Sequence, residues 1–348
     1  MIYICATYDY ELFLGGSSYT EKEVLIDQTD TLLNLYASMN IPATYFVDAW
    51  SLLKYREYGF TTFPDLADEQ MRNMLSNGND VQLHIHPQWV NAIYNDGKWK
   101  FKKNEYSIGN FSYNVAEGEL ERDKVIKDGI HYLEEVLRKI YPEYRIVAYR
   151  AGGYCLEPFD ENIDLLIKNG IAIDSSVVSG LYRDDFPIHY DYRKYTSNKG
   201  FYLKKGMYEL PIGSIRSITQ KLWYRMMYPI YVNYNTKGYC ITSQNTKKQK
   251  RITKYGKKIK NLFDTSKGYM LTFDERRWDG MLYLIDEALK ETDYRIEDEF
   301  LTIVGHPKVL NERLVENTSM FLTEVKKKYG DNLQFITLTD VWKMKCKK

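Results

Sequence analysis

The sequence predicts an α/β fold in which parallel strands form a closed or nearly closed barrel. Short apolar runs alternate with longer helical patterns over most of the 348 residues, and such alternation is typical of parallel strands joined by crossover helices. About seven strand–helix units can be counted, more than a small open sheet needs. Hydrophobic residues make up 44 % of the chain, enough for a sizeable core. We expect a barrel-like single domain, residues 1–348, with insertions at about 91–119 and 216–267.

The strands are predicted from short apolar runs, and the helices from apolar residues that recur every three or four positions. The first helix shows this spacing at Val24, Leu25, Leu32, Leu33 and Leu35. The expected strands are Ile2–Tyr8, Ala43–Val47, Val81–Ile85, Arg145–Tyr149, Ile171–Asp174, Phe300–Val304 and Gln334–Leu338. The expected helices are Glu21–Met39, Asp68–Leu75, Leu120–Ile140, Phe159–Lys168, Met281–Leu289 and Leu310–Lys328, followed by a last short helix.

Charge is distributed unevenly along the chain. The formal net charge is +1, which gives no overall attraction toward nucleic acid. Residues 216–267 nevertheless hold 13 Lys and Arg against a single acid, Asp264, so the rest of the chain is acidic. The four cysteines include no CxxC pair, so neither a disulfide framework nor a cysteine zinc site is indicated. Without a signal-peptide pattern or a membrane-spanning stretch, a cytoplasmic location is expected.

Polar residues stand where the predicted strands end. In parallel barrels the chemistry is carried by the carboxyl ends of the strands. The residues found at these ends are Asp9 and Glu11, Asp48, His84 and His86, Arg150, Asp174, and His306. We therefore expect a functional site at this end of the barrel.

His84 and His86 are the candidate metal ligands. Two residues apart on a strand, they leave by the same face with Cα atoms roughly 6.6 Å apart, so both imidazoles can converge on one cation. Asp9 and Glu11 repeat this spacing, so that one carboxylate can complete the ligand set while the other serves as general base toward water. The structural alternatives are a polar pair on a half-exposed strand for the histidines and a cap or turn role for Asp9.

Arg150 and His306 complete the candidate site. Arg150 precedes Ala151-Gly152-Gly153 and can fork onto a carboxylate, while the glycines let backbone N–H groups approach a ligand. His306 is placed to act as general acid, and Asp174 could orient it. A surface arginine before a turn and a buried structural histidine are the alternatives.

Together these motifs resemble the polysaccharide deacetylases of the NodB-homology (carbohydrate esterase 4-like) superfamily. The resemblance covers roughly residues 1–215 and 270–345. Its supporting stretches include Ile41-Pro42-Ala43-Thr44-Tyr45-Phe46-Val47-Asp48 and Glu209-Leu210-Pro211. The main motifs are Thr7-Tyr8-Asp9-Tyr10-Glu11, His84-Ile85-His86-Pro87, Tyr149-Arg150-Ala151-Gly152-Gly153-Tyr154, Asp174-Ser175-Ser176 and Gly305-His306-Pro307.

The resemblance implies a distorted (β/α)7 barrel that removes N-acetyl or O-acetyl groups from a glycan. It implies that Asp9 is the catalytic base, that Arg150 positions it, and that His306, backed by Asp174, protonates the leaving amine. Glu11, His84 and His86 would hold zinc or a similar divalent ion. The expected substrate-binding residues are Gly153 and Tyr154, whose backbone would help to hold the oxyanion, together with Asp48 and Trp89. This chain departs from the family pattern in Glu11, where Asp is usual, in HxH instead of HxxxH, and in Gly-Gly where Pro is common.

Two other interpretations stay open. An amidohydrolase barrel also uses HxH, but on its first strand and with two further histidines, whereas this chain has five His in all and its HxH falls on the third strand. A non-catalytic sugar-binding protein would keep the fold and the pocket without turnover.

The expected partner is an acetylated sugar or oligosaccharide, nucleotide-linked or lipid-linked, and no nucleic acid. Residues 216–267 are expected either to dock a phosphate-bearing precursor or the inner membrane surface, or to form a solvated insertion that packs on the barrel. The aromatic and apolar residues behind this expectation are Trp223, Tyr224, Met226, Met227, Tyr228 and Tyr231.

Overall fold

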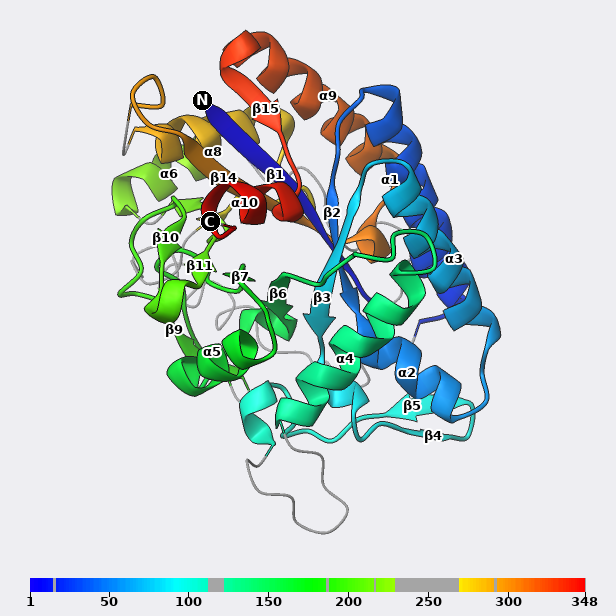
Figure 1. The fold of residues 1–348 in the computed structure, drawn as a ribbon. Helices are drawn as coiled ribbons and strands as arrows, with labels where there is room; N and C mark the ends of the chain where they lie inside the picture. The colour runs from blue at the N-terminus through cyan, green and yellow to red at the C-terminus, as the bar shows by residue number, and fades with distance from the viewer. Residues whose placement is uncertain are drawn as a thin grey trace, which may run out of the picture.

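The fold is built around one nine-stranded sheet (Figure 1). The computed structural model describes residues 1–14, 17–111, 122–185, 188–215, 217–228, 269–290 and 293–347. The strands lie in the order β10-β11-β7-β6-β3-β2-β1-β14, with β15 also paired to β1. They are β1 (Ile2–Tyr10), β2 (Thr44–Asp48), β3 (Asp80–Ile85), β6 (Ala148–Ala151), β7 (Ile173–Asp174), β10 (Phe201–Tyr202), β11 (Tyr208–Glu209), β14 (Glu299–Gly305) and β15 (Leu333–Phe335).

Apart from the β10–β11 pair, neighbouring strands of this sheet are parallel. β1 pairs with three strands: β14 runs along one edge of it, while β15 and β2 share the other. β1, β2 and β3 are almost entirely buried, because helices pack on their outer face and the other strands close over the inner one.

The two ends of the sheet are brought together by a narrow seam. Ile212, three residues after β11, bridges both to Val178 and to Thr302 of β14. On the same strand Val304 bridges to Thr272, which follows β13 (Tyr269–Met270). The sheet therefore curls into a barrel whose last gap is filled by isolated bridges, and the predicted barrel-like α/β fold is confirmed.

The helices surround the strands (Figure 1). A turn of π-helix (Lys22–Ile26) leads into the first of them. They are α1 (Asp27–Ser38), α2 (Ala49–Glu57), α3 (Thr62–Ser76), α4 (Arg122–Leu137), α5 (Phe159–Lys168), α6 (Ile218–Met227), α8 (Trp278–Leu289), α9 (Glu312–Tyr329) and α10 (Leu338–Lys345). No helix within the described ranges is long and apolar enough to cross a membrane.

α9 illustrates why these segments are helical. The side chain of Asn311 caps its first turn by accepting a hydrogen bond from the Leu314 N–H at 3.1 Å. Leu314, Phe321 and Val325 then recur on one face and are buried. The helix is thus specified at its start by the cap and along its length by the apolar face that it packs on the barrel.

Three two-stranded ribbons lie outside the main sheet in the described part of the chain. They are β4 (Ile93–Asn95) with β5 (Lys98–Lys100), β8 (Tyr182–Asp185) with β9 (Ile188–Asp191), and β12 (Ser214–Ile215) with β13. The first ribbon lies in the predicted insertion at 91–119, of which residues 112–119 fall outside the described part of the chain. In the insertion at 216–267, α6 is described, whereas residue 216 and residues 229–267 are not.

Several predicted boundaries are wrong. Arg145–Tyr149 was expected as a strand, yet β6 begins at Ala148 and runs to Ala151. The run Gln334–Leu338 ends as a strand at Phe335, because Thr337 caps α10 by accepting a hydrogen bond from the Asp340 N–H. α2 was not predicted, because it follows β2 with no loop, and α3 begins six residues before the expected Asp68.

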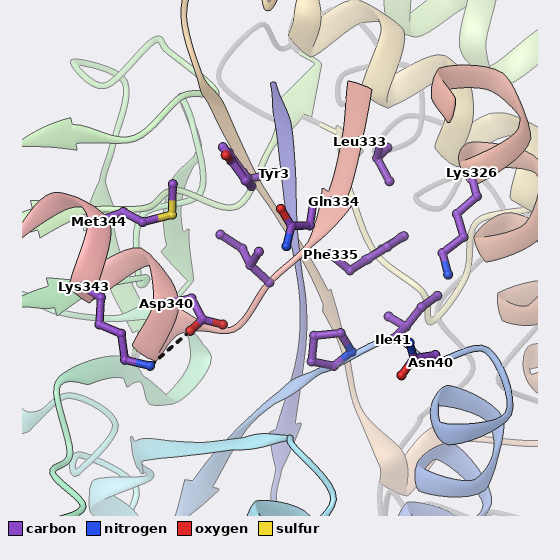
Figure 2. Close-up of a pocket in the computed structure, with 12 residues that line it drawn as sticks. Tyr3, Asn40, Ile41, Lys326, Leu333, Gln334, Phe335, Asp340, Lys343 and Met344 are labelled. Atoms are coloured by element: carbon purple, nitrogen blue, oxygen red, sulfur yellow. Dashed lines mark hydrogen bonds and ion pairs between the residues drawn. The ribbon is translucent and has the colours of Figure 1, made fainter. Parts of the chain in front are cut away.

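A cavity of about 660 Å³ lies at the amino end of the barrel (Figure 2). Tyr3 at the start of β1 and Leu333–Phe335 of β15 line it, and α10 contributes the Lys343–Asp340 ion pair. None of the predicted site residues lines this cavity. The predicted chemistry therefore belongs to the opposite end of the strands.

Candidate active site

The carboxyl ends of β1, β3, β6 and β14 bring the predicted charged residues together. Asp48, His84 and Arg150 are in register across β2, β3 and β6, and Tyr8, next to Asp9, is in register with Gly305, next to His306. All except His306 are buried, and the His306 side chain is 20 % exposed. The residues that were expected to meet at the strand ends thus lie close together, and their roles stay predictions.

Glu11, His84 and His86 form a cluster suited to a metal ion. Their ligand atoms lie within 4.8 Å of one another, and the groups are buried. Nε2 of His84 is 3.0 Å from Oε2 of Glu11, and Nε2 of His86 contacts the same oxygen. This is the one group of three potential ligands of this kind found among the described residues.

The hydrogen bonds of His84 turn its Nε2 toward Glu11, as a metal ligand requires. Its Nδ1 lies 2.8 Å from the Arg150 carbonyl oxygen, which can only accept, so Nδ1 carries the hydrogen. Without a hydrogen on Nε2, the lone pair of this atom faces a carboxylate oxygen of Glu11, whereas a protonated Nε2 donates to that oxygen. Two acceptors that face each other in a buried site repel unless a proton or a metal ion lies between them. The donor set, two imidazoles and one carboxylate, is one that zinc accepts.

Asp48 lies behind this cluster. It is 1 % exposed, and its Oδ1 accepts the backbone N–H of His86 at 3.0 Å. Burial raises the pKa of Asp48 to about 7, against the opposing effect of His86. The carboxyl group therefore fixes the position of His86, and its predicted contact with substrate stays a prediction.

Lys308 is a charged neighbour that the sequence analysis missed. Its Nζ lies 2.5 Å from Oε1 of Glu11, and the side chain is 15 % exposed. Burial raises the pKa of Glu11, but His86 and Lys308 outweigh it and hold this pKa well below its usual range. The position of Lys308, two residues after His306 in the same strand-end loop, was the signal available in the sequence.

Asp9 and Arg150 form a buried ion pair. Arg150 donates to Oδ1 of Asp9 at 2.7 Å, and its remaining donors are held by Thr7 and by the carbonyl and hydroxyl oxygens of Ser175. Burial acts to raise the pKa of Asp9, but Arg150 and the nearby histidines lower it below its usual value. Asp9 is therefore an ionised, fixed carboxylate, as a general base must be.

Asp274, and not Asp174, orients His306. Oδ2 of Asp274 lies 2.6 Å from Nδ1 of His306, and Oδ1 accepts the His306 backbone N–H at 2.9 Å. Despite the opposing effect of burial, Asp274 raises the pKa of His306 to about 9, so the ring is protonated at neutral pH. Its Nε2 points at Asp9 Oδ2 (3.5 Å) and Glu11 Oε1 (3.6 Å).

The prediction that Asp174 supports His306 is therefore wrong. Asp174 is fully buried, and its Oδ1 accepts the hydroxyl of Ser176 at 2.7 Å. Burial raises the pKa of Asp174. Its carboxyl group lies against Glu209, and burial together with Asp174 raises the pKa of Glu209 as well. The two acids hold the segment after β7, because Asp174 accepts the Ser176 hydroxyl and Glu209 accepts the Val177 N–H. Ser175 and Ser176 of this segment accept hydrogen bonds from Arg150 and from the backbone of Ala151.

Gly153 and Tyr154 lie in a tight turn next to the cluster. Their φ angles are +58° and +63°, in the left-handed region. A Cβ on the preceding Gly152 would come within 2.7 Å of the Ile85 carbonyl oxygen and 2.9 Å of His86 Nδ1, so only glycine fits there. Burial, followed by Asp9, raises the pKa of the Tyr154 phenol, which is therefore near the base. The oxyanion role of this turn stays a prediction.

Trp89 lies at the edge of the site. It is 1 % exposed, and its backbone N–H donates to the His86 carbonyl oxygen at 3.1 Å. Its ring packs edge-on against Trp99 of the β4–β5 ribbon. The predicted substrate-binding residue is thus attached directly to a candidate metal ligand.

Comparisons with known proteins give structural neighbours of low sequence identity only. No family model and no curated protein matches the chain. A protein described as a putative polysaccharide deacetylase from Mycobacterium smegmatis is similar in structure, with 13 % identity and a TM-score of 0.49, over 99 % of this chain and 90 % of its own. A protein described as a probable polysaccharide deacetylase from Pseudomonas aeruginosa PAO1 is similar at 12 % identity and a TM-score of 0.48, over 99 % of this chain and 92 % of its own. Puue allantoinase is similar at 12 % identity and a TM-score of 0.49, over 100 % of this chain and 92 % of its own. At this level of likeness none of them carries an argument about the activity of this chain.

Proposed function

We propose that this protein is a metal-dependent hydrolase that removes an acetyl group, most simply an N-acetyl group, from a sugar of a glycan or glycan precursor. The observation that supports it is one metal-type cluster beside two charged pairs, whose facing atoms, Asp9 Oδ2 and His306 Nε2, lie 3.5 Å apart. Asp9 is an ionised base held by Arg150, and His306 is a protonated acid held by Asp274. Hydrolysis of an amide is assisted by a base, which takes a proton from the attacking water, and by an acid, which protonates the leaving nitrogen.

Glu11, His84 and His86 are the residues that would hold a divalent metal ion, with zinc as the candidate. Such an ion supplies Lewis acidity to the acetyl carbonyl and to the attacking water.

The chain's own residues perform the proton transfers. Asp9 takes a proton from the water, and Arg150 keeps the carboxylate ionised and in one orientation. His306 gives its Nε2 proton to the nitrogen of the leaving amine, since its Nδ1 is held by Asp274. A backbone N–H of the turn at Gly153 and Tyr154 is proposed to donate to the developing oxyanion.

The test combines metal analysis with acetate release. Purified protein is analysed for metal and assayed on a panel of N-acetylated and O-acetylated oligosaccharides, with and without chelator. Acetate release that chelator abolishes and added zinc restores supports the proposal. A metal-free protein that binds the glycans without releasing acetate would instead be the non-catalytic sugar-binding protein.

A second proposal concerns contact of residues 216–267 with an anionic, phosphate-bearing surface. α6, which begins this segment, buries Lys221 and Tyr224 against the barrel but exposes Leu222, Trp223 and Met226 at 42 %, 47 % and 69 %. Tyr224 packs on the rings of Tyr228, Tyr269 and Tyr283. An apolar, exposed helix face followed in the sequence by many Lys and Arg suits the surface of an anionic membrane.

A further inference from the structure

A second cavity lies beside the candidate active site. It has a volume of about 930 Å³ and begins at Leu12, the residue after Glu11. Its other walls are residues 17–24, the segment from the end of α2 into α3, Trp89, and the β4–β5 ribbon. In Figure 1 this ribbon lies beyond the carboxyl ends of β2 and β3, near α2. We call it the aromatic cavity.

The aromatic cavity is joined to the metal-type cluster through side chains and backbone. Lys308, which pairs with Glu11, places its Nζ 5.3 Å from the centre of the Phe13 ring, and Phe13 lines the cavity. From the other side, Trp89 donates its backbone N–H to the His86 carbonyl oxygen. A molecule with its acetyl group at the cluster therefore has this cavity as its neighbour.

Six rings in mutual contact give the cavity rigid walls. Tyr55, Phe63 and Trp89 are buried, whereas Phe60 is 38 % exposed and Tyr94 and Trp99 are half-buried. The centroid separations are 5.0 Å for Tyr55–Trp99, 4.8 Å for Phe60–Tyr94 and 5.3 Å for Trp89–Trp99. The buried rings hold the accessible ones in place, so little conformational entropy is lost when a ligand binds.

Polar groups surround the rings. The Tyr55 hydroxyl donates to Glu21 at 2.6 Å, and hydroxyl side chains of the segments 17–20 and 61–62 line the same cavity. A sugar ring needs this combination, because its C–H face packs on aromatic carbon while its hydroxyl groups require donors and acceptors. An acyl chain offers these hydroxyl groups no hydrogen bond, whereas a sugar does, so the lining favours a carbohydrate.

From this geometry we infer that the aromatic cavity binds the sugar residues next to the acetylated one, and that the substrate is therefore an oligosaccharide or longer glycan. The volume is at the upper end of the roughly 300–1,000 Å³ found for ligand sites, more than one sugar ring fills. The inference rests on the proposed function for the identity of the reacting group, but the binding of the glycan itself does not depend on turnover.

Phe60 and Tyr58 provide a matched test. Both are 38 % exposed and belong to the same turn, but Phe60 lines the cavity and Tyr58 does not. Phe60→Ala and Tyr58→Ala are compared with the wild-type protein on acetylated oligomers of one to six sugars, from β-1,4-linked N-acetylglucosamine and O-acetylated xylose series. Binding of the same oligomers is measured by tryptophan fluorescence on an Asp9→Asn background, which separates recognition from turnover.

The expected result is that affinity and kcat/KM rise with chain length in the wild-type protein and in Tyr58→Ala. In Phe60→Ala the gain from monomer to tetramer falls by roughly three- to tenfold, the range for the loss of one aromatic contact. Retained melting temperatures show that both variants fold.

Three results would overturn one or both proposals. Acetate release that is independent of chain length and unaffected at Phe60 refutes the aromatic cavity as a glycan site but leaves the deacetylase intact. Chain-length-dependent binding that needs Phe60 but is never followed by acetate release refutes the hydrolase and retains the glycan site. Neither binding nor release with either series refutes both.

Discussion

Replacement of Asp274 by Asn tests the acid half of the site. Asp274 is the main group that raises the pKa of His306 to about 9. The amide has nearly the same shape but no charge, so the ring stays in place and loses its counter-charge. Removal of an opposite charge at hydrogen-bond distance lowers a histidine pKa by roughly 1–3 units. Since His306 must be protonated to act, activity is present below its pKa and is lost as the pH rises through it.

The expected effect on the pH profile follows from these values. With a pKa of about 9, His306 is still mostly protonated at pH 8. A decrease of about two units would leave about one tenth of the rings protonated at that pH, so kcat/KM there falls about tenfold, while the loss at pH 6 is small. The alkaline limb of the profile thus moves from about pH 9 to near neutrality.

The assay is acetate release between pH 5 and 10, with metal content checked at each pH. Asp174→Asn is the matched control, because Asp174 contacts Ser176 and Glu209 instead of His306. Its alkaline limb is expected at the wild-type position. If Asp274→Asn folds, keeps its metal and retains an alkaline limb near pH 9, then His306 is not the acid. A limb that moves in Asp174→Asn as well would contradict the assignment of Asp274 as the specific partner.

Further substitutions test the other parts of the site. His84→Ala should lose both bound metal and nearly all turnover without unfolding, and full metal occupancy in this variant would exclude the cluster as the metal site. Asp9→Asn should keep metal but lose turnover, whereas Glu11→Ala should lose metal; exchanged phenotypes would exchange the roles of base and ligand. Lys308→Met should bind zinc more tightly by about tenfold or more, since like charges at such distances repel by roughly 1–4 kcal/mol, and an unchanged zinc affinity in a calorimetric titration would show that Lys308 does not oppose the metal. Trp223→Ser should weaken co-sedimentation with anionic liposomes at low salt, and a wild-type protein that never sediments would leave α6 as a structural helix only.

The strand-end residues were predictable because all parallel strands of a barrel end at one edge. Given the strands, Asp9, His84, Arg150 and His306 had to lie near one another whatever the details of packing. The neighbours of each residue were not predictable, since they depend on strand order. Asp174 was assigned to His306 as an acid at a strand end, yet β7 lies five positions from β14 in the sheet.

Asp274 was missed because the segment that carries it hardly looks like a strand. β13 has two residues, and only the single bridge from Thr272 to Val304 aligns it with β14. That bridge nevertheless places Asp274 level with His306, two residues further along both segments. Lys308 was missed for a different reason: it follows Pro307, beyond the end of the strand, where side-chain direction cannot be read from a period of two.

The pairing of β12 with β13 has a consequence for how the chain tolerates its long basic segment. Ile215 is in register with Tyr269, so the two paired strands are joined by a connection of which α6 is the described part. The entropy of closing a loop grows only with the logarithm of its length, by about 0.6 kcal/mol for each doubling. A longer connection between β12 and β13 therefore costs little stability. The pairing of these strands places Asp274 beside His306 whether the connection is long or short.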